Sequence, residues 1–145
     1  MGIFNWGSKK KDEAARIAVI ESNKQKQKEL GEKLYLALKS AADSNKIYNV
    51  FHDSALNKDM VSDSLGKIEV LPTKNDGMIF SVLVTVYDKT ATLNPVIIQA
   101  GVNVEENRVH ALYGAYGPEE TKTIDDFGSL LEKMIEHVQK WRLYH

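Results

Sequence analysis

The chain contains no cysteine among its 145 residues. This absence excludes disulfide bonds, thiolate nucleophiles and metal sites built from cysteine. A protein without disulfides suits a reducing compartment, so we expect a cytoplasmic protein. A chain of this length buries roughly two-thirds of its unfolded surface on folding, and a single domain therefore needs no covalent cross-link.

Long apolar runs and a large charge of one sign are also missing. The longest apolar-rich stretch, residues 78–87, is much shorter than the 18 or so residues that a membrane-spanning helix requires. The formal net charge is −1 at pH 7, so no overall field favours nucleic acid or an anionic membrane. The basic residues of the N-terminal third are interleaved with acids and lack an aromatic stacking platform, and we expect no nucleic-acid partner.

The usual catalytic motifs are not found in the sequence. It has no glycine-rich phosphate loop, no GxSxG elbow and no HExxH motif. The four histidines are scattered without the spacing of metal ligands: His52, His110, His137 and His145. Adjacent carboxylates such as Glu119 and Glu120 usually point apart and form no ready acid–base pair. We expect no catalytic residue, no metal and no cofactor, which favours a non-enzymatic protein.

Residues 12–44 have a composition typical of helix, with no proline and a single glycine. Two apolar groups occur in this segment: Ile17, Val19 and Ile20, then Leu30, Leu34, Leu38 and Ala41. The stretch ESNKQKQKE between them has no apolar residue. One long helix with a solvated middle, two helices joined near Ser22 and Asn23, or a projecting arm held by a partner would each fit this pattern. Residues 45–66 are ambiguous; we expect irregular structure with some helix, or a short strand over residues 47–52.

From Lys67 onward the apolar pattern changes to period two, which predicts a sheet over residues 67–116. Four strands are expected, at residues 67–72, 78–87, 96–104 and 108–116, and their short connections favour an antiparallel meander. One face of the sheet is aliphatic, with residues such as Val82, Val84, Ile98 and Val109. The stretch GPEETK is expected to break the sheet.

A C-terminal amphipathic helix is predicted over residues 123–142, starting at Thr123 as N-cap with Asp126 close to a capping box. Its apolar stripe should cover the aliphatic sheet face: Ile124, Phe127, Leu131, Met134, Ile135, Val138 and Trp141. The sequence therefore predicts the α+β class, with a flexible tip at residues 1–11 and one domain over residues 12–145.

The second face of the predicted sheet is more apolar than a fully solvated face should be. Large side chains on it are expected to form a protein-binding surface: Ile79, Leu83, Tyr87, Ile97, Leu112 and Tyr116. Polar residues such as Ser81 and Gln99 lie between them. Either the N-terminal helix of the same chain covers this face, or another protein or a second copy of the chain does.

The same face offers an alternative small-ligand or enzymatic site around Arg108, His110 and Tyr116. A carboxylate from the turn at Glu105 and Glu106 could tune His110 as an acid–base group. A surface histidine with ordinary neighbours is the simpler interpretation of the same residues.

The first residues combine an apolar tip with a positive collar: Ile3, Phe4 and Trp6, followed by Lys9, Lys10 and Lys11. Such a segment could bind an anionic membrane surface weakly, dock into a groove on a partner or a neighbouring subunit, or be a flexible terminus.

Taken together, these features favour a small cytoplasmic, bacterial-type binding module that acts through its sheet face and N-terminal arm. Chaperone-like, adaptor, regulatory and immunity-type proteins belong to this class, and self-association is one form that the binding could take. The alternatives are the ligand site near His110 and peripheral attachment to a membrane through the tip.

Overall fold

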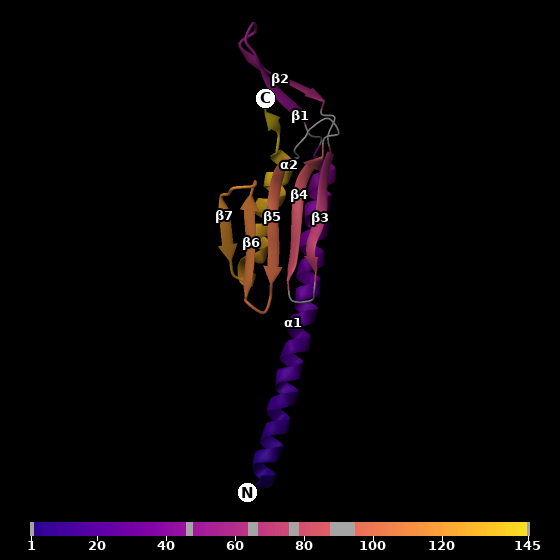
Figure 1. The fold of residues 1–145 in the computed structure, drawn as a ribbon, viewed down its shortest axis with the longest axis vertical. Helices are drawn as coiled ribbons and strands as arrows, with labels where there is room; N and C mark the ends of the chain where they lie inside the picture. Colours follow the sequence, from indigo (N-terminus) through magenta and orange to yellow (C-terminus); the bar gives the residue numbers. More distant parts are fainter. Residues whose placement is uncertain (1, 46–47, 64–66, 76–78, 88–94, 145) are drawn as a thin grey trace.

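The computed structural model describes the backbone of residues 2–45, 48–63, 67–75, 79–87 and 95–144, and the side chains of residues 12–45, 52–60, 68–75, 79–87 and 95–142. Figure 1 shows a long helix, α1, that begins at Gly2 and ends at Ser44, beside a sheet and a second helix. The other elements follow in chain order: β1 (Tyr48–Asp53), β2 (Lys58–Asp63), β3 (Lys67–Asn75), β4 (Phe80–Tyr87), β5 (Val96–Asn103), β6 (Arg108–Tyr113), β7 (Glu119–Lys122), η1 (Ile124–Asp126), α2 (Phe127–Lys140) and β8 (Leu143–Tyr144).

The main sheet has five strands in the order β3-β4-β5-β6-β7, and all neighbouring strands are antiparallel. The α+β class and the antiparallel meander predicted from the sequence are confirmed. The meander has one strand more than expected, because β7 pairs with β6 instead of ending the sheet. Gly114 and Gly117 have φ of 87° and 108°, and these left-handed conformations turn the chain back toward β6.

The hydrophobic core lies between one face of this sheet and the two helices. Val84 stands opposite Val70 on one side and Ile98 on the other, and all three belong to the core or pack against it. From the helices, Leu34 and Leu38 of α1 and Met134 and Val138 of α2 have no exposed surface. The predicted aliphatic sheet face and its cover by the C-terminal helix are therefore confirmed.

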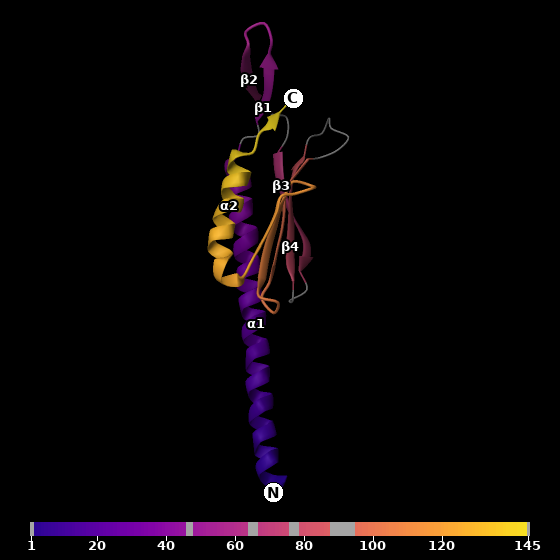
Figure 2. The same ribbon diagram turned by 90° about the vertical axis from the view of Figure 1, so that its left-hand side faces the viewer.

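Helix α1 is continuous, without a joint near Ser22 and Asn23. Its second half packs beside α2 on the same sheet face, as Figure 2 shows. The interpretation that the N-terminal helix covers the second face is wrong: the stripe of Leu34, Leu38 and Ala41 packs into the aliphatic core, which is wide enough for two helices. The first half of α1 extends beyond the sheet, and residues 12–22 are exposed.

Residues 48–63 form an antiparallel hairpin of β1 and β2, so the expectation of irregular structure with some helix is wrong there, whereas β1 agrees with the alternative of a short strand over residues 47–52. The Asp53 carboxylate accepts hydrogen bonds from the backbone N–H groups of Ala55 at 2.9 Å and Leu56 at 3.1 Å, which is a side-chain-directed turn. Asn57 closes the turn with φ of 49°. Strand β8 pairs in parallel with β1 and ties the C-terminal segment to the hairpin.

Helix α2 begins later than the sequence predicts, because the short 3-10 helix η1 precedes it. Thr123 occupies the N-cap position of η1, as expected, but its side chain makes no capping hydrogen bond. The side chain of Asn107 instead accepts a hydrogen bond from the Ile124 N–H at 3.2 Å. None of the helices in the described part of the chain combines the length and apolar character that a bilayer crossing requires.

Candidate functional site

The sheet face opposite the two helices carries a row of large side chains that crosses four strands. Leu71 stands opposite Leu83, Leu83 opposite Gln99, and Gln99 opposite Leu112. Leu71 is 44% exposed, and Leu83, Gln99 and Leu112 are half-buried. The helix residues of the hydrophobic core lie on the other side of the sheet (Figure 2), so we call this surface, defined by these four residues, the open sheet face.

The next row of the same face is polar and contains His110. Its register partners are Gly101 on β5 and Thr121 on β7. The imidazole lies across Gly101, since a Cβ at that position would be 2.5 Å from Cε1 of His110. Loss of hydration lowers the pKa of His110, the nearby Arg108 lowers it further, and Glu119 opposes both effects. The ring is therefore mainly neutral at pH 7 and packs as part of the sheet.

The sequence-predicted contact residues are dispersed in the structure. Leu83 and Leu112 lie on the open sheet face, Ile79 is half-buried just before β4, and Tyr87 ends β4. Tyr116 is fully exposed in the loop after β6. Ile97 is fully buried and leaves the set, because a register shift pairs Val84 with Ile98 but Thr85 with Val96. This bulge breaks the alternation on which the prediction depended.

The residues proposed from sequence for ligand binding are not gathered into a pocket. Arg108 begins β6, and its guanidinium pairs with the Glu106 carboxylate at 2.8 Å. Tyr116 lies beyond the other end of the same strand. Neither of the two cavities described next is lined by Arg108, His110 or Tyr116.

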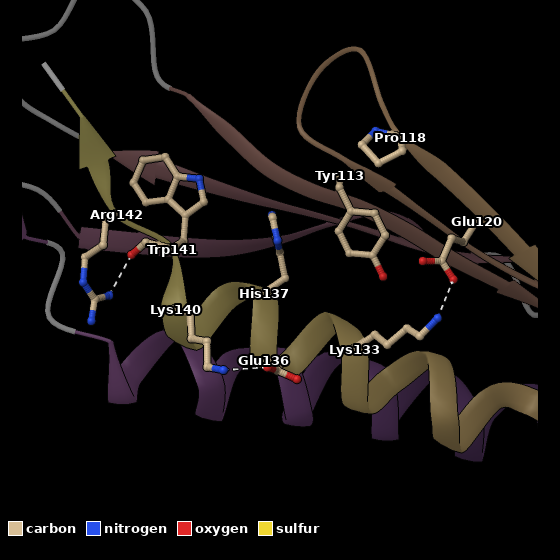
Figure 3. A pocket seen from close by; sticks show the side chains of 9 residues that line it. All are labelled: Tyr113, Pro118, Glu120, Lys133, Glu136, His137, Lys140, Trp141 and Arg142. Carbon is tan, nitrogen blue, oxygen red and sulfur yellow. Dashed lines mark hydrogen bonds and ion pairs between the residues drawn. The ribbon is translucent and has the colours of Figure 1, made fainter.

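A cavity of about 670 Å³ lies between α2 and the strands β6 and β7. Its lining is shown in Figure 3: Tyr113, Pro118, Glu120, Lys133, Glu136, His137, Lys140, Trp141 and Arg142. The Tyr113 and His137 rings meet edge to face with centroids 5.0 Å apart. Ion pairs join Lys133 to Glu120 at 3.2 Å and Lys140 to Glu136 at 2.6 Å. We call this the aromatic cavity, after Tyr113, His137 and Trp141.

Two polar side chains of the aromatic cavity, Tyr113 and His137, are affected by burial. The Tyr113 hydroxyl is buried and has no hydrogen-bond partner among the described residues. Burial raises the pKa of Tyr113, and Glu120 raises it further. Burial lowers the pKa of His137, while a hydrogen bond to the Ile97 backbone opposes that effect. Of these three aromatic residues, only Trp141 belongs to the apolar stripe predicted from the sequence, and no spacing in the sequence links Tyr113 on β6 to His137 and Trp141.

A second cavity, of about 490 Å³, lies where α1 leaves the sheet. It is lined by Lys24, Gln27, Lys28, Gly31, Glu32, Tyr35, Pro72, Asn75 and Phe80, and we call it the helix-base cavity. At this level the Gln27 amide donates to the Val102 carbonyl at 2.9 Å and accepts from the Val104 N–H at 2.8 Å. Gly31 leaves room for the Phe80 ring, because a Cβ there would be 3.0 Å from Cγ of Phe80.

The apolar tip and its lysines lie within α1, which begins at Gly2. The side chains of these residues lie outside the part of the chain that the structure describes: Ile3, Phe4, Trp6, Lys9, Lys10 and Lys11. Within the part of the chain that the structure describes, no cluster of three or more His, Cys, Asp or Glu side chains is arranged to hold a metal ion. No family model, curated protein or solved structure matches this chain.

Proposed function

We propose that this chain is a protein-binding module whose partner docks on the open sheet face. The observation that carries the proposal is the row of Leu71, Leu83 and Leu112, which meet solvent on the side of the sheet away from the helices. An antiparallel sheet with one solvated face normally carries polar residues on that face. Leucines in register across several strands are instead suited to contact with another apolar surface.

Polar side chains surround the leucines, as they do at the rim of many protein interfaces. Gln99 stands within the row, Glu119 ends it on β7, and Ser81 and His110 lie in the adjacent row. Protein interfaces commonly combine an apolar centre with polar groups at the rim. A chaperone-like, adaptor, regulatory or immunity-type protein of the cytoplasm would use such a face to hold another chain.

The proposal is tested with a photo-crosslinking amino acid at position 83 in the full chain, expressed in its own cells. The control places the same group at position 36, because Leu36 is exposed on α1, away from the sheet face. A partner crosslinked from position 83 but not from position 36, whose affinity for the purified chain falls at least tenfold in Leu83→Glu, supports the proposal. Equal crosslinking from both positions, or unchanged affinity in Leu83→Glu, contradicts it.

A second candidate function is binding of a small aromatic ligand in the aromatic cavity. The Tyr113 hydroxyl, which has no partner within the described part of the chain, and the neighbouring His137 ring favour it, since a ligand can both stack and hydrogen-bond there. Trp141 reports on this cavity directly once the only other tryptophan is replaced by Trp6→Phe. Saturable quenching of Trp141 by an aromatic carboxylate, lost in Tyr113→Ala, supports this function. Quenching that does not saturate, or that survives in Tyr113→Ala, argues against it.

A further inference from the structure

The first half of α1 is a helix without a packed face in the described structure. It extends past the sheet (Figures 1 and 2), and Ile17 and Ile20 are 55% and 48% exposed. An isolated helix in water gains little stability from its own hydrogen bonds and depends on the packing of an apolar face. Large apolar side chains on a free helix therefore indicate a surface that is covered by a partner.

The exposed isoleucines continue the row of residues by which α1 contacts its own domain. Gln27, Leu34, Leu38 and Ala41 are buried and follow one another at intervals of seven, four and three residues. Extending the same alternation of three and four toward the N-terminus gives Lys24, Ile20, Ile17 and Glu13. These are a and d positions of a heptad, the pattern by which one helix packs along another. We call these four residues the α1 seam.

We propose that the α1 seam binds a second copy of this chain, with the two helices antiparallel. In this arrangement Ile17 packs against the partner's Ile20, and Glu13 faces the partner's Lys24. A two-fold axis then passes between Ala18 and Val19, so each contact occurs twice. The proposal goes beyond the proposed function, because the open sheet face takes no part in it.

The charges of the α1 seam select this orientation. A parallel pair would place Glu13 against Glu13 and Lys24 against Lys24, and like charges in such a layer oppose association. The antiparallel pair places opposite charges on both sides of the two isoleucine layers. The charges at positions 13 and 24 therefore favour the antiparallel pair and disfavour the parallel pair.

The domain itself limits how far the seam extends. Gln27 is nearly fully buried, and its side chain is hydrogen-bonded to Val102 of β5 and to Val104 just after β5. The exposed part of the row therefore ends at Lys24. In the antiparallel register, residues 2–12 of the partner reach the level of residues 25–35 of this copy, beside the helix-base cavity and not on the buried face of Gln27 and Leu34. Several residues lining the helix-base cavity, such as Gly31 and Tyr35, lie at that level.

A charge exchange tests the orientation, with the mass of the full chain in solution measured by light scattering and sedimentation. We expect the wild-type chain to be a dimer, and Glu13→Lys or Lys24→Glu alone to weaken dimerisation roughly tenfold or more. The double variant Glu13→Lys, Lys24→Glu should restore it, because each pair is then reversed. A monomeric wild type at micromolar concentration, or no rescue in the double variant, overturns the proposal.

Substitutions at apolar positions test the surface while Glu13 and Lys24 stay unchanged. Ile17→Asp should give a monomer, whereas Val19→Asp should leave the dimer intact, since Val19 is also exposed but lies off the seam. Both residues are exposed in a single chain, so the core is unaffected by either change. A dimer that survives Ile17→Asp but is lost in Leu83→Glu would assign self-association to the open sheet face and overturn this proposal while leaving the proposed function intact.

The absence of native cysteine permits a direct test of the register. Glu13→Cys and Lys24→Cys chains are mixed and oxidised, and we expect a mixed disulfide-linked dimer. A Glu13→Cys chain that crosslinks efficiently to itself would indicate a parallel pair and overturn the proposal. A dimer that forms no mixed crosslink would show that Glu13 does not lie opposite Lys24 of the partner, and would also overturn the proposal.

Discussion

His110 lies over Gly101 on the neighbouring strand, with its imidazole in the space that a Cβ at position 101 would occupy. The His110 ring can therefore take this position only because residue 101 has no side chain. This contact with β5 explains why His110 is half-buried, although it lies on the side of the sheet away from the helices.

We expect Gly101→Ala to destabilise the fold by about 1–3 kcal/mol, because its Cβ meets both the His110 ring and the Phe80 carbonyl oxygen. Chemical denaturation measures the change in the free energy of unfolding. In a His110→Ala background the same substitution should cost less, since the ring that it displaces is gone. An equal cost in both backgrounds would show that the Phe80 backbone alone causes the strain.

Stability should decrease in acid through His110 and His137. Burial lowers the pKa of both residues below the ordinary 6.5, so the unfolded chain takes up protons before the folded chain does. Their neutral forms leave stability intact above about pH 6.5, and it is lost as the pH falls from there through the folded pKa values. Unfolding free energies measured from pH 8 to pH 5 should fall less steeply in His110→Gln and His137→Gln than in the wild type.

Gln27→Ala should cost about 1–3 kcal/mol, because it leaves the Val102 carbonyl and the Val104 N–H without their shared partner. Gln27→Glu provides the matched comparison: a carboxylate still accepts from Val104 but cannot donate to Val102 when ionised. Thermal unfolding should therefore rank the wild type above both variants. Equal stability of all three chains would mean that solvent replaces these hydrogen bonds without cost.

Leu38→Ala should destabilise the chain by about 2–5 kcal/mol, since Leu38 is fully buried between α1 and the sheet. Leu36→Ala is the control, because Leu36 lies on the same helix and is exposed. Its effect should stay within about 0.5 kcal/mol. Similar effects at the two positions would contradict the packing of the second half of α1 on the core.

The sheet and the final helix were predictable because a single periodicity runs through each of them. Val82, Val84 and Ile98 belong to aliphatic rows with a period of two, and Met134 and Val138 share one helix face, so sequence alone assigns them to the core. Strand β7 was missed because EETK has no apolar alternation; only its pairing with β6 makes it a strand. The second strand of the hairpin, β2, was missed for a related reason, since Lys58–Asp63 has few apolar residues.

The location of the candidate sites was less predictable than the fold. Alternation placed Leu83 and Leu112 on the open sheet face correctly, but it cannot foresee a bulge, which buried Ile97. The position of α1 was wrong because Leu34 and Leu38 suit either sheet face by pattern, and only the width of the core decides between them. The aromatic cavity depends on Tyr113 and His137, which lie on different elements and meet only after folding.

Helix α1 projects well beyond Gln27, whose hydrogen bonds anchor it to the sheet. At 1.5 Å per residue, its first residue lies roughly 38 Å beyond that anchor. A tilt of about 5° at the anchor would sweep the free end through roughly 3 Å, so a modest rearrangement near Val102 and Val104 is amplified at the distal end of the rod.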